Sequence, residues 1–314
     1  MIRIDSIEAG RGSLPRRSAK QMSNERESYV LTMQEDTPEL IEQWRDALDE
    51  LYMEFRKRSR AALKDYDVED VHQARVSARK LLTLLPVLDP DDESGLYRPI
   101  KKAQKRFGRV RDADVLIGEF KQLRQEAKEA GRGDESRLFK RMAKLEKEER
   151  RSQRKKLSAK LPKIVNGKLD RRWKTFLKED LPELAARADV VGSVRELKDD
   201  YRKRRHVYQV TADRAGLYSD EALDALHQVR IAAKRCRYTA EAAAFALGDK
   251  QAEDAEHFKS VQKRLGEVND RHVRIRIADD YGPEALGADE AGWTAFRERL
   301  DAQLKEALEE VGEL

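Results

Sequence analysis

Two ten-residue stretches of the chain carry the same pattern of ionisable side chains. The first, residues 71–80, reads Val-His-Gln-Ala-Arg-Val-Ser-Ala-Arg-Lys, and the second, residues 226–235, reads Leu-His-Gln-Val-Arg-Ile-Ala-Ala-Lys-Arg. Two of the five histidines in the chain, His72 and His227, thus stand at matching positions, each three residues before an arginine. Arginine offers a planar fork to phosphate oxygens, lysine a point charge and histidine a donor that titrates near neutral pH. The pattern favours an anion-binding site.

Placed on a helix, each stretch separates a basic face from an apolar face. At about 100° per residue, His72, Arg75 and Arg79 share one stripe. The residues expected on the core side of this helix are Ala74, Ala78, Leu81, Leu82 and Leu85. In the second stretch the polar stripe contains His227, Arg230, Lys234 and Arg235, continued by Tyr238 and Glu241. Its expected core residues are Val229, Ala233, Cys236 and Ala240.

A second pair of repeated blocks follows the first. Residues 101–115 and 259–273 are identical at eight of fifteen positions, and they lie 158 residues apart, against 155 for the histidine stretches. In a continuous helix Lys101, Lys105, Gly108 and Asp112 would form one polar stripe. Two ordered repeats at nearly one offset predict two copies of one helical bundle. A glycine on this stripe, Gly108 or its counterpart Gly266, suggests close approach of a helix or ligand, because glycine otherwise weakens a helix.

The elements that position these motifs are expected to be helices throughout. Charged residues make up 40% of the chain and aromatic residues only 6%, a composition typical of long amphipathic helices. Apolar periodicity and capping residues predict the following approximate helices: 38–63, 68–88, 95–108, 112–130, 135–160, a short one around 173–184, one through 201–206, 219–248, one from 258 onward, and 290–310. The fold class is therefore all-α.

The chain divides into a tail and a duplicated domain. We expect residues 1–30 to form a flexible N-terminal tail and residues 31–314 one domain, with the repeats covering about 35–160 and 168–312. Proline and glycine between residues 161 and 167 mark the boundary. A single cysteine, the lack of a long apolar run and a polar N-terminus predict a cytoplasmic protein with no membrane span.

These motifs resemble the CHAD family, the conserved histidine α-helical domain. The resemblance rests on His72-x-x-Arg75-x-x-x-Arg79-Lys80, on the stretch from His227 through Arg237-Tyr238 to Glu241, and on the two Gly-x-x-x-Asp blocks, and it covers about residues 35–310. It implies two helical bundles related by pseudo-twofold symmetry around a basic central cavity. It also implies binding of inorganic polyphosphate and association with polyphosphate granules.

The resemblance assigns polyphosphate binding to specific positions. The predicted binding residues are His72, Arg75, Arg79, Lys80, Lys101, Lys105, His227, Arg230, Lys234, Arg235, Arg237, Tyr238, Lys259 and Lys263, with Arg56, Arg60, Arg202 and Arg205 as weaker candidates. Sulfate or phosphate ions are expected to mark the same site. Some family members carry a triphosphate-processing CYTH domain. No alternating Glu-x-Glu-x-Lys strand occurs near the N-terminus, which argues against triphosphatase activity.

Several other interpretations stay open at the level of sequence. Basic helix faces are usually solvated, and Asp112 and Asp270 could form structural ion pairs. Nucleic-acid binding is the second candidate function, although stacking of bases needs more aromatic residues than Tyr238. A metal-dependent phosphohydrolase ranks lower, because no clustered carboxylates or histidines accompany the motifs. A helical scaffold for other proteins is a fourth interpretation. We predict no catalytic residues, no metal and no cofactor.

Overall fold

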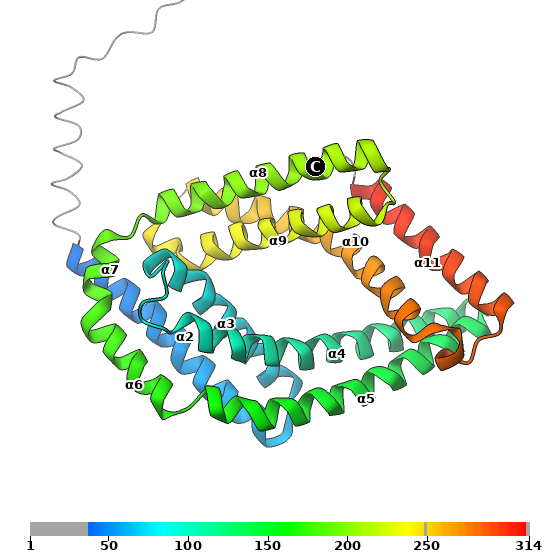
Figure 1. Ribbon diagram of the computed structural model, residues 1–314, viewed down its shortest axis with the longest axis horizontal. Helices are drawn as coiled ribbons and strands as arrows, with labels where there is room; N and C mark the ends of the chain where they lie inside the picture. The colour runs from blue at the N-terminus through cyan, green and yellow to red at the C-terminus, as the bar shows by residue number, and fades with distance from the viewer. Residues whose placement is uncertain (1–36, 248–249, 312–314) are drawn as a thin grey trace, which may run out of the picture.

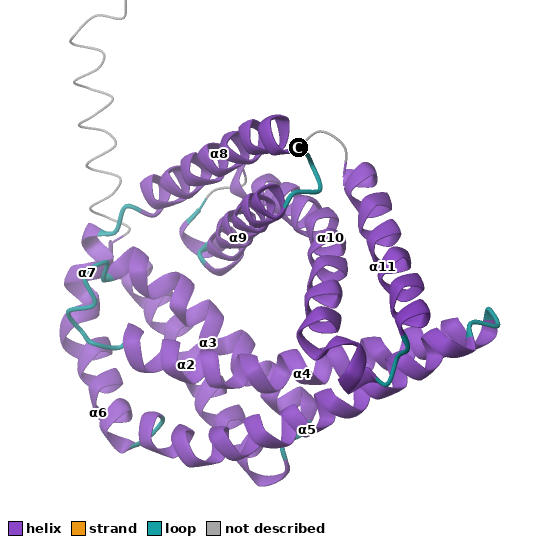
Figure 2. Cartoon of the chain, turned by 45° about the vertical axis from the view of Figure 1, so that its right-hand side comes forward, coloured by secondary structure: helices purple, strands orange, loops and turns teal. Residues whose placement is uncertain are grey.

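The computed structural model describes residues 37–247 and 250–311. Every regular element in these residues is helical, and no strand occurs among them (Figures 1 and 2). The helices are α2 (Thr37–Asp65), α3 (Val68–Leu88), α4 (Tyr97–Glu129), α5 (Gly133–Ile164), α6 (Gly167–Thr175), α7 (Leu181–Arg187), α8 (Val190–Ala215), α9 (Asp220–Ala242), α10 (Lys250–Leu286) and α11 (Glu290–Val311). The predicted all-α class is confirmed, and the predicted tail lies outside the described residues.

The helices that carry the histidine stretches begin at side-chain caps. At α3 the carboxylate of Asp67 accepts hydrogen bonds from the backbone N–H groups of Glu69 and Asp70. At α9 the hydroxyl of Ser219 accepts one from Ala222. These caps satisfy N–H groups that a helix leaves unpaired at its first turn. They fix where each helix starts, and α3 has the bounds that the sequence predicts.

Four predicted features of the helices differ from the structure. Residues 97–129 form one continuous helix, so the break expected near Gly108 does not occur, because Phe107 and Val110 beside it are fully buried. Helix α5 continues through Pro162 to Ile164, and the short helix expected at 173–184 is α6, a π-helical turn (Phe176–Asp180) and α7. Helix α9 ends at Ala242, before a 3₁₀ turn (Ala244–Ala246), whereas the predicted end, Gly248, lies outside the described residues.

Two hydrophobic cores hold the helices together. The first joins α2, α3, α6 and α7 to the N-terminal half of α4 and the C-terminal half of α5. The second joins α8, α9, α10 and α11 to the C-terminal half of α4 and the N-terminal half of α5. The antiparallel pair α4–α5 therefore passes through both cores, along the lower side of Figure 1. Each half of the molecule depends on the same two long helices.

The two halves use their helices in the same order. Helix α3 packs between α2 and α4, and α9 packs between α8 and α10. In both ribbon views α3, α4, α9 and α10 border the middle of the molecule (Figures 1 and 2). Helices α3 and α9, which carry the two histidine stretches, also contact each other. The matching order of helices in the two halves is consistent with two copies of one helical bundle. Internal duplication of the chain is still a prediction.

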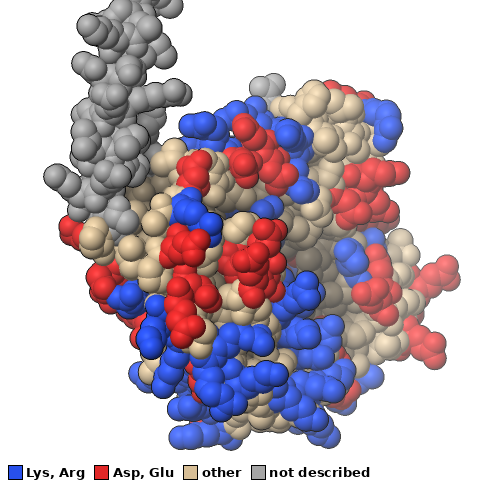
Figure 3. Space-filling model, turned by 60° about the vertical axis from the view of Figure 1, so that its left-hand side comes forward, with Lys and Arg blue, Asp and Glu red and all other residues tan. Residues whose placement is uncertain are grey.

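Charge is segregated on the molecular surface. Figure 3 shows Lys and Arg gathered over the lower part of one face and Asp and Glu concentrated above them. The net charge of +5 conceals this separation. None of the described helices combines the length and the apolar character needed to cross a membrane.

The shared α4–α5 pair predicts cooperative unfolding. Phe107 lies in the first core and Phe120 in the second, and both are fully buried. We expect Phe107→Ala and Phe120→Ala each to lower the free energy of unfolding by about 3–5 kcal/mol. Val115 lies between them on α4 and is 47% exposed. Val115→Ala should change the free energy of unfolding by less than about 0.5 kcal/mol. Urea denaturation followed by circular dichroism measures these changes. Two resolved transitions, one for each core, would contradict the coupling.

Candidate anion-binding site

Arginines and a lysine of the two histidine stretches come together where α3 meets α9. The pKa of Lys234 on α9 is lowered to about 8, chiefly because the side chain is buried. The positive charges of Arg230, Arg75 and Arg79 contribute to this shift, whereas the carboxylate of Asp112 opposes it. We call these five side chains the central basic cluster. Four cations and one acid share it, so the cluster has an excess of positive charge.

The single acid in this cluster does not balance the cations. Burial is the largest influence on Asp112 and raises the pKa of its carboxyl, although the side chain keeps contact with solvent. Arg75, Lys234 and Arg111 act in the opposite direction. One carboxylate on α4 thus lies between cations of α3 and α9. It links the three helices electrostatically and leaves a net positive field for an anion.

An aromatic ring holds one of the arginines in place. The guanidinium carbon of Arg79 lies 3.9 Å from the ring centroid of Tyr238, and that of Arg237 lies 5.5 Å from it. Burial lowers the pKa of Arg79. Arg237 also donates a hydrogen bond of 2.6 Å to Glu241, as expected for neighbours one turn apart on a helix. Cation–π contact keeps the Arg79 fork ordered without neutralising its charge.

Several buried nitrogen atoms at this junction lack hydrogen-bond partners among the described residues. They are Nε of Arg75, Arg79 and Arg230, and Nδ1 of His72. Buried polar atoms are nearly always hydrogen-bonded, and leaving one unpaired costs about 1–3 kcal/mol. Each guanidinium Nε can only donate. The junction is therefore suited to a ligand rich in hydrogen-bond acceptors.

His72 and His227 each lie near the same position of the repeated block in their own half of the chain. Burial is the main cause that lowers the pKa of His72, and the positive charge of Arg111 is the second. Nδ1 of His227 lies 2.7 Å from the side-chain oxygen of Asn269. Arg111 and Asn269 occupy matching positions of the repeated blocks, each one residue before the shared aspartate. Sequence reasoning named neither residue as part of the site, although the 158-residue offset between the blocks aligns them.

The two repeated glycines differ in their surroundings. A Cβ atom on Gly108 would lie 3.7 Å from Nε of Arg75, an ordinary van der Waals distance. At Gly266 no atom lies within 4 Å of the corresponding position. Close approach of another helix therefore explains neither glycine. Arg75 lies beside Gly108 at a distance that an alanine there would tolerate.

A second group of cations connects α4 to α9. Burial lowers the pKa of Lys101, followed by the charges of Lys105 on its own helix and Arg235 on α9. Arg235 also lies 3.6 Å from Asp200 of α8. Lys101 of the predicted stripe on α4 thus lies within electrostatic range of Arg235 of the predicted stripe on α9.

Other predicted residues lie outside this junction or have partners of their own. Lys80 and Lys263 are exposed, and Lys259 pairs with Glu256 at 3.0 Å. Arg202 pairs with Asp199 at 2.7 Å on the surface of α8, and Arg205 lies beside Tyr201. None of these contacts joins the central basic cluster.

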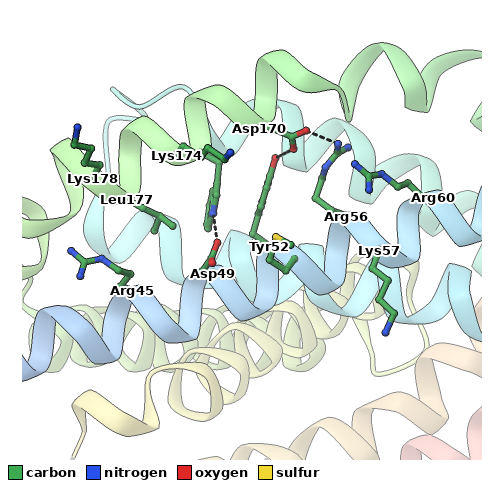
Figure 4. Close-up of a pocket in the computed structure, with 12 residues that line it drawn as sticks. Arg45, Asp49, Tyr52, Arg56, Lys57, Arg60, Asp170, Lys174, Leu177 and Lys178 are labelled. Carbon is green, nitrogen blue, oxygen red and sulfur yellow. Dashed lines mark hydrogen bonds and ion pairs between the residues drawn. The ribbon is translucent and has the colours of Figure 1, made fainter.

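The two weaker candidates on α2 belong to a different pocket. Arg56 and Arg60 line a cavity of about 590 Å³ between α2 and the segment from α6 to the π-helical turn (Figure 4). Arg56 is buried and pairs with Asp170 at 2.6 Å, and Asp170 also accepts a hydrogen bond of 2.8 Å from the hydroxyl of Tyr52. The ring of Trp173 stacks on Tyr52 with centroids 4.2 Å apart. These contacts consolidate the first core.

The described residues contain no group of three or more His, Cys, Asp or Glu side chains arranged to hold a metal ion. His272 lies near His227, and burial lowers the pKa of His272, followed by the positive charge of Arg276. Asn269 and Arg230 line the same small cavity as these two histidines. In the central basic cluster, four cations stand against the single carboxylate of Asp112.

Comparison with known proteins agrees with this fold. The CHAD domain family matches residues 46–279, most of the chain, and the protein therefore belongs to the CHAD family. Its structure is similar to the crystal structure of the CHAD domain from the plant Ricinus communis, with a TM-score of 0.57 and 20% sequence identity over 86% of this chain and 91% of that one. At this identity the likeness concerns the fold. No curated protein matches the chain.

The central basic cluster predicts an unusual lysine titration. We expect Lys234 to titrate with a midpoint of about 8 instead of the ordinary 10.5, as measured by NMR of the protein with ¹³C-labelled lysine. Asp112→Asn should lower the midpoint, because it removes the opposing carboxylate, and Arg75→Gln should raise it. Lys234→Arg identifies the resonance by deleting it. A midpoint near 10.5 in the folded protein would contradict the cluster.

Proposed function

We propose that this protein is a non-catalytic binder of linear inorganic polyphosphate and that the polymer binds at the central basic cluster. The observation that carries the proposal is the contact between α3 and α9, where the half-buried arginines Arg75, Arg79 and Arg230 have buried Nε atoms with no partner among the described residues. The CHAD family to which the chain belongs is associated with polyphosphate binding. Every phosphate of this polymer supplies acceptor oxygens and negative charge.

The proposed contacts follow from the chemistry of each side chain. Arg75 and Arg230 offer planar forks from opposite helices, which suit the paired oxygens of a phosphate. Lys234 adds a point charge that an anion would stabilise in its protonated form. Lys101 and Arg235 extend the positive field along α4 and α9. Successive phosphates would thus meet cations of both halves, and binding would draw the protein to polyphosphate granules in the cytoplasm.

A nucleic acid fits the same charges less well. Proteins that bind single strands stack bases on exposed aromatic rings between the cations. Tyr238, the aromatic residue of the junction, is half-buried and has the guanidinium of Arg79 over its ring. The face that would receive a base is thus already occupied. This contact favours a ligand that consists of phosphate alone.

The proposal includes no reaction. Hydrolysis of a phosphoanhydride needs a positioned metal or a general base near a water molecule. Burial raises the pKa of Asp112, the acid of the central basic cluster, against the opposing charges of Arg75, Lys234 and Arg111, and we assign this carboxyl no role in proton transfer. Release of phosphate from polyphosphate in the presence of Mg²⁺ or Mn²⁺ would overturn this part of the proposal.

Titration with long-chain polyphosphate at two salt concentrations tests the proposal. Affinity should fall steeply with salt, as it does when a polyanion releases its counterions. Arg75→Ala combined with Arg230→Ala should weaken binding by roughly 100-fold or more, because two charge-assisted hydrogen bonds are lost.

A matched pair of variants controls for net charge. Arg137→Ala combined with Arg187→Ala removes the same charge from exposed arginines that pair locally with Asp134 and Glu183. This pair should bind nearly as the wild type does. Equal losses in both double variants would mean that only overall charge matters and that the cluster is not the site.

The titration of Lys234 gives the proposal a pH dependence. The free protein loses the Lys234 proton as the pH rises through about 8, whereas a bound polyanion favours the protonated form. Affinity should therefore decline as the pH rises above this value, by roughly tenfold, the equivalent of one charge-assisted hydrogen bond. Lys234→Arg should remove the decline, since guanidinium stays charged throughout. An identical decline in that variant would assign it to another group.

A further inference from the structure

A groove on the outer side of the α4–α5 pair is lined almost entirely by cations. Its volume is about 370 Å³, and apart from Ile164 every lining residue is a lysine or arginine. Helix α4 supplies Lys102, Lys105, Arg106 and Arg109, and α5 supplies Lys160 and Lys163. We call these six side chains the outer basic groove.

The groove continues past the end of α5. A neighbouring cavity of about 260 Å³ shares Lys102, Lys163 and Ile164 with it and extends along the start of α6. Lys168 and Arg172 lie on this extension. Basic side chains dominate the lower part of the molecule in Figure 3, the level at which α5 and α6 lie in Figure 1.

The cations of the outer basic groove have no acidic partners in the described parts of the chain. No aspartate or glutamate lines either cavity, and none forms an ion pair with the six side chains. Elsewhere on the surface, arginines commonly pair with a neighbour on their own helix, as Arg187 does with Glu183 at 3.3 Å. Six like charges around one groove repel each other, and an anion that fills the groove relieves this repulsion.

Neighbouring lysines join the outer basic groove to the central junction. Lys101 lies close enough to both Lys105 and Arg235 of α9 for their charges to lower its pKa. Lys105 in turn lines the outer basic groove. A continuous line of positive charge therefore runs from α9 across the N-terminal half of α4 to α5.

We propose that the outer basic groove binds a second stretch of the same polyphosphate chain that occupies the central basic cluster. This inference rests on the proposed function, and it adds a physical reason for preferring long chains. A polymer that reaches both places gains the second contact at high effective concentration, whereas a short one fills only the first. The residues that line the groove include no aromatic ring, which disfavours single-stranded RNA as its occupant.

The test compares chain lengths in a variant that leaves the central basic cluster intact. Lys102→Gln, Lys160→Gln and Lys163→Gln together remove three exposed charges of the groove. A matched variant removes three exposed lysines of α5 that do not line it, through Lys144→Gln, Lys147→Gln and Lys155→Gln. Calorimetric titrations use tripolyphosphate, long-chain polyphosphate and single-stranded RNA, and circular dichroism verifies folding of each variant.

We expect the groove variant to lose affinity for long-chain polyphosphate only. The groove variant should bind long-chain polyphosphate at least tenfold more weakly than the matched variant, while affinity for tripolyphosphate stays within twofold. Equal affinities of the two variants for long-chain polyphosphate would contradict binding at the outer basic groove, and the proposed function would be unaffected. A wild-type protein that binds no polyphosphate at all would overturn the proposed function itself. Loss of RNA binding alone in the groove variant would assign the groove to nucleic acid and overturn the inference.

Discussion

The contact between α3 and α9 places like charges close together in a partly buried setting. Burial and the charges of Arg230, Arg75 and Arg79 lower the pKa of Lys234, and the carboxylate of Asp112 opposes this shift only in part. Such a junction is unfavourable in itself, so something else must hold the helices there. The two hydrophobic cores do so, and the 3₁₀ turn that follows α9 reaches into the first core, where the ring of Phe245 packs edge-on against Trp44.

The α4–α5 pair explains why this arrangement is stable as a whole. Both helices pass through both cores, so neither core can rearrange without disturbing the other. The same pair presents Asp112 and Lys101 toward α9 and the outer basic groove toward solvent. One rigid element therefore sets the spacing between the two basic regions, which is the condition for a single polymer to reach both.

The halves are alike in plan and different in chemical detail. His72 faces Arg111, whereas His227 is hydrogen-bonded to Asn269 at the equivalent position. Arg56 of the first half is buried against Asp170, whereas Arg202 of the second half pairs with Asp199 on the surface. At the junction, α3 supplies two arginines with an unpartnered buried Nε, Arg75 and Arg79, whereas α9 supplies one, Arg230. The two sides of the junction would thus present unequal sets of donors to a ligand.

The sequence by itself determined the helices and the faces of α3 and α9. Periodicity and caps specify them locally, which is why α3 and α11 lie close to their predicted bounds and Val229, Ala233, Cys236 and Ala240 are all buried. Only the tertiary structure decided that α4 continues through Gly108, since burial of Phe107 and Val110 outweighs the weak helix preference of one glycine. It also decided which cations meet. Arg75 acts on Lys234 of α9, whereas Arg56 pairs with Asp170. The local sequence around each arginine does not distinguish these two roles, because they depend on contacts between residues far apart in the chain.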